Sequence, residues 1–207
     1  MTGFQLKLLA MLCMTADHIG AVLFPGIPLL RWIGRLAMPV FCWGIGEGFR
    51  HTRSRRRYLG RLVGLALLSE LPFDFAFYGG ICSGHQNVFF TLALGLLALW
   101  ALRTPWAGWP GALLMGLAAE LLRCDYGIYG VLLILALDQF RERPRVQAGA
   151  VFLLTLLLFG ANSQLLAVLA VPLLACYNRR RGPDDHHLFY LYYPLHLCVL
   201  GFLRILF

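Results

Sequence analysis

Ionisable residues lie inside stretches of this chain that are otherwise apolar enough to cross a membrane. A charged residue at the centre of a membrane helix costs roughly 2.5 to 3.5 kcal/mol. Such residues usually face the interior of a helix bundle or a wet cavity, pair with one another and mark a functional site. The sequence therefore predicts that the chemistry of this protein lies within its membrane helices. The residues concerned are Asp17, His18, Arg31, Arg35, Glu70 and Asp74.

The composition is typical of an integral membrane protein with an all-α fold. Hydrophobic residues make up 59% of the 207 residues and charged residues only 14%, whereas soluble domains carry about 25% charged residues. The longest clearly polar stretch is 51–57, so we expect a single membrane domain over 1–207. The first apolar run continues past any small-residue cleavage site, with Lys7 as its one basic residue, and is expected to remain as a helix.

Arginine clusters predict the orientation of the helices. The clusters at 50–61, 141–145 and 179–181 each follow a hydrophobic run, which is the pattern of cytoplasmic loops. The net charge of +8 is therefore assigned to topology and to contact with the lipid bilayer, and nucleic acid is not an expected partner. The pattern predicts a multi-pass protein with a cytoplasmic amino terminus and about nine spans, eight or ten being left open. The runs are 4–24, 31–49, 60–78, 88–103, 109–122, 126–140, 147–160, 163–177 and 188–207.

His18 is the natural candidate for a general base near neutral pH. On a helix its neighbour Asp17 points about 100° away, so a histidine–carboxylate pair needs a partner from another helix or a break near Gly20. The structural alternative is a hydrogen-bonded imidazole beside a carboxylate that pairs with an arginine. The residues alone leave both interpretations open.

Arg31 and Arg35 are spaced i, i+4 and present two guanidinium groups on one helix face. Because the two cations repel each other, they need carboxylates or an anionic ligand such as phosphate. Glu70 and Asp74 lie one turn apart around Pro72, which tends to kink a helix, and are candidate partners. A structural ion network, an anion site and a proton or cation pathway are all open.

Other chemistry is less strongly indicated. No histidine pair has metal-ligand spacing on a helix, so no metal site is expected. His85 lies in the Gly-rich segment 79–87 and is expected to be exposed to solvent rather than to act as a ligand. Cys82 and Cys124 both map to the outer side, where a disulfide between them is left open.

Eight motifs occur in a fixed order along nearly the whole chain. With them the chain resembles the TraX family of bacterial inner-membrane proteins. One such motif would carry little weight, but eight in order are specific. The motifs are TGFQLKLLA at 2–10, DHIGA at 17–21, RWIGRLAMPVF at 31–41, EGFRHTRSRRRYLGRL at 47–62, SELPFD at 69–74, NVFFTLALG at 87–95, DYGIYGVL at 125–132 and YYPLHL at 192–197.

The resemblance implies a membrane acetyltransferase. The name-giving family member is associated with acetylation of the amino terminus of a conjugative pilin subunit. The family is also similar to membrane acyltransferases that use an intramembrane histidine and arginines. Those enzymes take an acetyl group from cytosolic acetyl-CoA, whose phosphates basic loops can attract, and deliver it to an acceptor reached from the other side. The expected acceptor is an amine or hydroxyl, such as the amino terminus of a peptide or small membrane protein.

Roles for individual residues follow from this resemblance. His18 is expected to be the general base, and Asp17 to orient or charge-balance the site. Arg35, with Arg31, is expected to stabilise developing negative charge. The residues expected to bind the acetyl-CoA co-substrate are Arg31, Glu47, Arg50, His51, Arg53 and His196. The residues expected to form the acceptor pocket are Glu70, Asp74, Asn87, Asp125 and Tyr126.

Two functions of other classes stay open. In an ion-coupled small-molecule transporter the same intramembrane charges would form the translocation path. In a non-catalytic membrane chaperone the helices would bind a small hydrophobic protein without turnover. The short chain and the lack of a visible internal repeat count against the transporter.

Overall fold

The computed structural model describes residues 1–82, 84–183 and 186–206 of the chain. Within these ranges every regular element is a helix, apart from an isolated bridge between Gln86 and Cys124, which confirms the predicted all-α class. Phe207, the end of the last predicted run, lies outside the described residues. In chain order the elements are α1 (Gly3–Val22), α2 (Pro28–Gly34), α3 (Ala37–His51), α4 (Arg55–Tyr78), α5 (Val88–Leu102), α6 (Gly108–Leu121), α7 (Gly127–Gln139), α8 (Pro144–Phe159), the 3₁₀-helix η1 (Ser163–Leu169), α9 (Ala170–Ala175) and α10 (His186–Leu206).

Local capping and proline signals explain where the helix limits differ from the predicted runs. α4 begins at Arg55 rather than at residue 60, because Ser54 Oγ accepts a hydrogen bond from Arg57 N and caps the helix there. The second run is divided at 35–36 into α2 and α3, since Pro39 has no N–H to donate to the carbonyl of Arg35. The predicted helices are otherwise present, with limits that shift by a few residues.

One further segment departs from a regular run. The predicted run at 163–177 begins as η1 and continues as α9, after a turn in which Asn162 Oδ1 accepts from Gln164 N at 2.8 Å. α4, by contrast, is one continuous helix through Pro72, so the expected kink does not interrupt it. The third predicted run is therefore a single long element that reaches both ends of the bundle.

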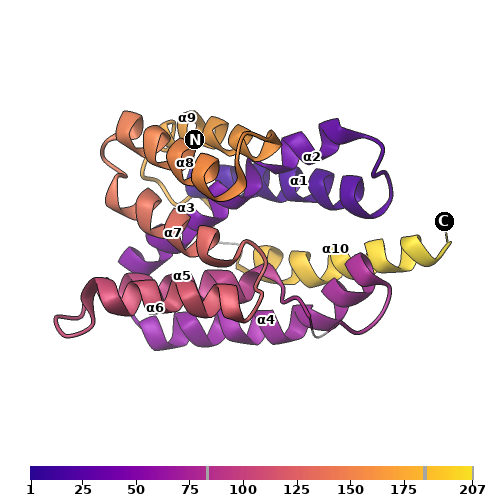
Figure 1. Cartoon of the computed structure of the whole chain (residues 1–207), viewed down its shortest axis with the longest axis horizontal. Coiled ribbons are helices and arrows are strands. Elements are labelled where there is room, and N and C mark those ends of the chain that lie inside the picture. Colours follow the sequence, from indigo (N-terminus) through magenta and orange to yellow (C-terminus); the bar gives the residue numbers. More distant parts are fainter. Residues whose placement is uncertain (83, 184–185, 207) are drawn as a thin grey trace.

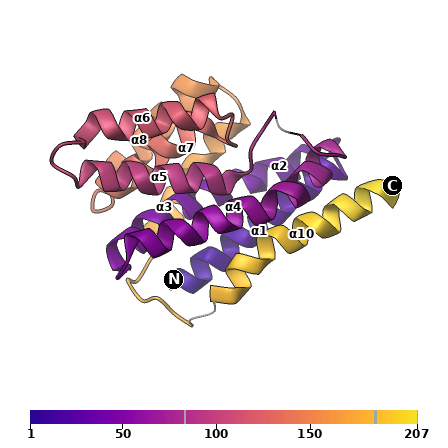
Figure 2. The same ribbon diagram turned by 90° about the horizontal axis from the view of Figure 1, so that it is seen from below.

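The helices run back and forth roughly along the long axis of the molecule, so their connections gather at two ends (Figures 1 and 2). The end that carries the amino terminus is called the arginine-rich end. Gly3 N donates to Arg180 O and Phe4 N to Arg181 O, each at 2.9 Å, which ties the start of α1 to the segment after α9. The loops at this end are 52–54, 103–107, 140–143 and 176–183.

The opposite end is called the cavity end, and it holds fewer basic residues. Two main-chain hydrogen bonds join its two central loops, from Gln86 N to Arg123 O at 3.0 Å and from Asp125 N to Gln86 O at 2.8 Å. The arginine clusters that the sequence assigned to one side of the membrane thus lie at one end of the bundle. The loops at the cavity end are 23–27, 79–87, 122–126 and 160–162.

α7 lies at the centre of the bundle. Nine of its thirteen residues are buried, and it packs against α3, α5, α6 and α8. A helix that is apolar all round is expected in such a central position. Its first residues, next to the turn at 122–126, are thereby held beside α3, near the functional site.

Large apolar side chains cover much of the outer surface of the bundle. Leu67 on α4 is 66% exposed and Leu157 on α8 is 70% exposed, with similar residues along α6 and α10. Soluble monomers rarely expose contiguous apolar patches of more than a few hundred Å². By length and composition, one helix of the described residues is long and apolar enough to cross a membrane, Phe189–Leu206 within α10, with mean hydropathy 1.4. The exposed apolar side chains and the apolar helix α10 together indicate that the protein associates with a membrane.

Candidate active site

A cavity of about 420 Å³ lies at the cavity end, lined by residues of α1, α2, α3, α4, α5, α8, η1 and α10 and of the loops 79–87 and 122–126. Its volume falls within the range of roughly 300–1,000 Å³ that small-molecule sites occupy. Phe41, Phe73 and Phe77 form part of its apolar wall. The polar and ionisable residues that line it are Asp17, His18, Arg31, Arg35, Tyr78, His85, Asp125, Tyr126, Gln164 and Tyr193.

Asp17 and Arg31 form the ion pair that joins α1 to α2. Arg31 Nη1 donates to Asp17 Oδ2 at 2.5 Å and to the main-chain oxygen of Asp17 at 3.2 Å. The pair depends on Gly34, because a Cβ atom there would lie only 2.1 Å from Asp17 Oδ1. This is the structural partner that the sequence analysis left open for Asp17. Its second carboxylate oxygen, Oδ1, is buried without a hydrogen-bond partner among the described residues.

Arg35 is the unpaired cation of the cavity. No ion pair or side-chain hydrogen bond of Arg35 is found in the part of the chain that the structure describes, and its Nε is buried without a partner. Asp17 is already paired with Arg31, so one carboxylate faces two guanidinium groups. A half-buried cation in this situation favours an anion or a group that develops negative charge.

His18 is paired with a second histidine rather than with a carboxylate. His18 Nδ1 lies 2.7 Å from Nε2 of His196, which comes from α10. The two ring centroids are 5.0 Å apart and the planes differ by 10°, the arrangement of two nearly coplanar rings joined edge to edge. Phe77 and Tyr193 contact the His18 ring edge-on. Helix packing therefore supplies the interhelical partner that His18 requires.

His85 and Asp125 stand at the outer wall of the cavity, where their side chains are 3.9 Å apart. The Asp125 carboxylate raises the pKa of His85 above its ordinary value. The prediction that His85 is exposed to solvent is confirmed in part, because its side chain is 37% exposed. Pairing of its loop with the turn at 122–126 also brings it to the cavity. Beside it, Tyr126 has the uncommon φ of 64°, a conformation often found at functional sites.

Three residues expected in the acceptor pocket serve the local structure instead. Asn87 Oδ1 accepts from Phe89 N at 3.0 Å and caps α5, while its Nδ2 donates to Ala66 O at 2.7 Å and to Glu70. Asp74 Oδ2 accepts from Cys82 N at 2.9 Å. None of the three is among the residues lining the cavity.

The ion network between Arg31 or Arg35 and Glu70 or Asp74, one of the arrangements considered from the sequence, is therefore not formed among the described residues. N–H groups of the segment 79–87 donate to one oxygen of each carboxylate, Asp74 Oδ2 and Glu70 Oε2. The other oxygens, Asp74 Oδ1 and Glu70 Oε1, are buried without a hydrogen-bond partner among the described residues. The chain needs those acids to order the loop that carries His85.

Most of the residues expected to bind acetyl-CoA lie at the arginine-rich end. Arg50 donates to Glu47 at 2.7 Å and to Asp138, and Arg103 lies 3.5 Å from Asp138. Twelve residues at about 1.5 Å per residue place Glu47 roughly 18 Å from Arg35. The other two residues of this group, His51 and Arg53, are exposed at the same end.

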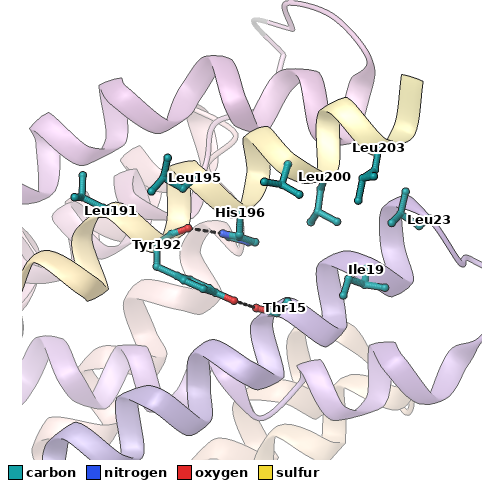
Figure 3. A pocket seen from close by; sticks show the side chains of 10 residues that line it. Thr15, Ile19, Leu23, Leu191, Tyr192, Leu195, His196, Leu200 and Leu203 are labelled. Atoms are coloured by element: carbon teal, nitrogen blue, oxygen red, sulfur yellow. Dashed lines mark hydrogen bonds between the residues drawn. The ribbon is translucent and has the colours of Figure 1, made fainter. Parts of the chain in front are cut away.

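His196 lines a second depression, named the apolar groove, on the other side of the histidine pair (Figure 3). The groove runs between α1 and α10 and has a volume of about 710 Å³. Sequence reasoning singled out His196 but missed the rest of the groove lining, and it missed Tyr78, Gln164 and Tyr193 in the cavity, because no local pattern distinguishes them from core residues. The groove is lined by Thr15, Ile19, Leu23, Leu191, Tyr192, Leu195, His196, Val199, Leu200 and Leu203.

Cys82 and Cys124 are both free thiols, so the structure contains no disulfide between them. Burial raises the pKa of the Cys124 thiol to about 11, which keeps it protonated near neutral pH. Neither cysteine is among the residues that line the cavity. The structure thus offers no cysteine nucleophile at this site.

Fold and site together define a membrane-associated helical protein with an internal cavity lined by histidine, arginine and carboxylate. The chain belongs to the TraX family, whose sequence pattern, described as TraX protein, matches residues 2–204. The resemblance stated from the motifs is thereby confirmed.

Two relatives illustrate the similarity. The chain is 31% identical over 236 residues to the "Probable fimbrial assembly protein FimC, serogroup H1" of Dichelobacter nodosus, covering 96% of this chain and 94% of that protein. It is 54% identical over 50 residues to an uncharacterized protein of Rickettsia prowazekii (strain Madrid E), covering 23% of this chain and 20% of the relative. No solved structure matches the chain.

Proposed function

We propose that this protein is a multi-pass acetyltransferase of the bacterial inner membrane, which moves an acetyl group from acetyl-CoA to an amine or hydroxyl. The observation that carries the proposal is the meeting of His18 with the unpaired Arg35 in one cavity. A histidine that can take a proton and a fixed cation that can stabilise an oxyanion are the two groups that acyl transfer requires.

His18 is the general base. It accepts the proton of the attacking amine or hydroxyl and returns it to the sulfur of the departing thiolate, so the reaction leaves the histidine unchanged. Arg35 faces the oxygen on which negative charge develops, and the Asp17–Arg31 pair holds α2 so that Arg35 stays in place. Removal of a positioned general base costs typically 10²- to 10⁴-fold in rate.

Acetyl-CoA would be held at two separate places. The cavity accommodates the acetyl group and the adjoining part of the pantetheine arm. The exposed arginines at the start of α4, with Arg53 before them, supply positive charge for the CoA phosphates at the arginine-rich end. The roughly 18 Å between Glu47 and Arg35 is comparable to the length of an extended pantetheine arm.

Nine segments cross the membrane in this proposal, with the amino terminus in the cytoplasm. α2 with α3, and η1 with α9, each count as one span, and the arginine-rich end faces the cytoplasm. The cavity then lies toward the outer side, within reach of an acceptor from that side. Asp125 and Tyr126 would contact this acceptor.

The class of acceptor is proposed from the name of one relative. The Dichelobacter protein is named as a fimbrial assembly protein, and the subunits of a fimbria are proteins, each with an amino terminus. We propose a peptide or small membrane protein of this kind as the acceptor.

The test is release of free CoA from acetyl-CoA by the protein in detergent, with and without a peptide that has a free amino terminus. His18→Ala is expected to lose at least about 10²-fold in rate, whereas Leu12→Ala, on the exposed face of the same helix, keeps it. Binding of acetyl-CoA is measured in the same samples. Full activity of His18→Ala, or wild type that neither binds acetyl-CoA nor releases CoA, would overturn the proposal. Accumulation of a solute in vesicles would favour a transporter instead.

A further inference from the structure

The histidine pair connects two helices that lie far apart in the sequence. His18 belongs to α1 and His196 to α10, and they are 178 positions apart. Only His18 lines the cavity, whereas His196 lines the apolar groove behind it. His196 is therefore placed to act on His18 and not on a molecule in the cavity.

The protonation of His196 follows from its second hydrogen bond. His196 Nδ1 lies 2.9 Å from the main-chain oxygen of Tyr192, as drawn in Figure 3. A carbonyl oxygen can only accept, so Nδ1 of His196 carries the hydrogen. In the neutral ring Nε2 then has the lone pair and must accept the hydrogen bond from His18 Nδ1. The free lone pair of neutral His18 is consequently on its Nε2.

The orientation of His196 is itself fixed by its neighbours. The Tyr192 ring lies parallel to it, with centroids 5.1 Å apart and planes 13° apart. Tyr192 Oη is 2.5 Å from Thr15 Oγ1, which donates its own hydrogen to Met11 O at 2.8 Å. Tyr192 must therefore donate to Thr15, which ties α10 to α1 next to the histidine pair (Figure 3).

The surroundings of His196 keep other hydrogen-bond partners away. Both ring nitrogens are occupied, and the rest of the groove is mainly aliphatic, with Ile19, Leu195 and Leu200 around it. No group in this lining competes for the proton on His18 Nδ1. The tautomer of His18 is thus set by its hydrogen bond to His196.

We propose that His196 is the positioning residue that fixes His18 in the tautomer with a bare Nε2. This rests on the proposed transferase function, in which Nε2 takes the proton from the acceptor and passes it to the leaving thiolate. The hydrogen on Nδ1 stays in the bond to His196, whose lone pair stabilises the imidazolium while it exists. His196 touches no reacting atom.

The tautomer is tested first, by ¹⁵N NMR of the histidine-labelled wild-type protein in detergent at a pH where both rings are neutral. The His18 signals are assigned by comparison with His18→Ala. A protonated Nδ1 and an unprotonated Nε2 are expected on His18. The opposite tautomer would overturn the inference, whether or not the protein transfers acetyl groups.

Kinetics provide the second test. His196→Leu removes the acceptor and is expected to lower kcat between about 10²- and 10⁴-fold, the upper figure being that for loss of an orienting carboxylate. The KM for acetyl-CoA should not change, because His196 does not contact it. His196→Gln places a side-chain oxygen near the former Nε2 and should recover at least 10-fold of the loss. A structural role alone would lower the amount of folded protein and leave kcat per folded molecule unchanged.

Two controls separate this inference from the proposed function. Tyr192→Phe removes the bond to Thr15 but keeps the carbonyl and the parallel ring, so kcat should fall by less than 10-fold. An active wild type with an inactive His18→Ala and a fully active His196→Leu would reject the positioning role alone. Equal losses in His196→Gln and His196→Leu, both folded, would reject it as well.

Discussion

Two clusters in this protein combine arginines with carboxylates, one at each end of the bundle. They differ in whether every arginine has a carboxylate partner. At the arginine-rich end, Arg50 bridges Glu47 and Asp138, and Arg103 adds a second cation to Asp138. At the cavity end, the ion pair beside Arg35 leaves that guanidinium group without a partner and borders a cavity of about 420 Å³.

The contrast separates a structural clamp from a site. The residue types and the helical setting are the same at both ends, so composition does not distinguish them. A cluster whose charges are all in ion pairs holds helices together, even though Arg50 Nε is buried there without a hydrogen-bond partner among the described residues. A cluster with a spare cation, an unpartnered carboxylate oxygen and space for a ligand can act on one.

Among the residues of these two clusters, Arg35→Ala has the largest expected effect on function. Loss of the unpaired cation should lower the acetyl transfer rate by about 10²- to 10³-fold, the usual cost of one donor to an oxyanion. The free energy of unfolding should change by less than about 0.5 kcal/mol, because no ion pair is broken. The acetyl transfer rate and the free energy of unfolding are both measured in mixed micelles. Arg35→Lys keeps the charge but not the planar guanidinium group, so its transfer rate should lie between those of wild type and Arg35→Ala. An unchanged rate in Arg35→Ala would show that the two clusters do not differ in function.

Arg50→Ala should have the opposite effect, a loss of stability with an unchanged transfer rate. It leaves Asp138, whose side chain is 8% exposed, with only the half-exposed Arg103 as a partner. Loss of one partner from a buried pair costs about 3 kcal/mol or more, while the transfer rate per folded molecule should be kept. Unfolding titrations would detect this, with Arg145→Ala, on an exposed arginine of α8, as the matched control. A stable Arg50→Ala variant would show that the cluster is not a clamp.

Gly34→Ala probes the contact that builds the cavity end. The new methyl group would overlap Asp17 and push α2 away from α1, at a cost of about 1–3 kcal/mol. The rate should fall as well, since the Asp17–Arg31 pair shifts. Gly44→Ala is the control, because nothing lies within 4 Å of a Cβ atom there, and it should be neutral or slightly stabilising. Thermal unfolding of both variants provides the comparison, and equal midpoints would contradict the packing argument.

The pair of His85 and Asp125 should have the smallest effect, and it should depend on pH. Because the pKa of His85 in the folded protein is raised above 6.5, its contribution is fully present below pH 6.5 and is lost as the pH rises through the raised value. Both side chains are about one third exposed, so the contribution stays below about 1 kcal/mol. Unfolding of wild type and His85→Gln from pH 5.5 to 9 should show a gap that closes toward alkaline pH. A gap that widens instead would mean that the neutral imidazole is the stabilising form.

Several features of this fold are readable from the sequence because they depend on local patterns. Apolar runs predict the helices to within a few residues, and capping by Ser54 or the missing N–H of Pro39 accounts for two of the differences. Positive charge between particular runs predicts that the arginine clusters share one end. These signals need only neighbouring residues, so no knowledge of packing is required.

Only some of the residues that form the site could be predicted from the sequence. His18, Arg35 and Asp125 are polar residues in or beside apolar runs, and such residues are costly unless they converge on a cavity. Glu70 and Asp74 carry the same signal but are used by a loop, and His85 carries none and still reaches the cavity. A carboxylate in an apolar run is equally well satisfied by a main-chain N–H or by an arginine, and the sequence does not distinguish these partners.

The sequence by itself determined the helices, the end that holds the basic loops and the stock of ionisable groups. The tertiary structure alone decided which of those groups meet. Asp17 pairs with Arg31 because Gly34 lets two helices approach, and His18 faces His196 because α10 returns beside α1 after almost the whole chain has been laid down. Hydrogen bonds and ion pairs act over a few ångströms, so partners that are far apart in sequence are fixed only once the helices have packed.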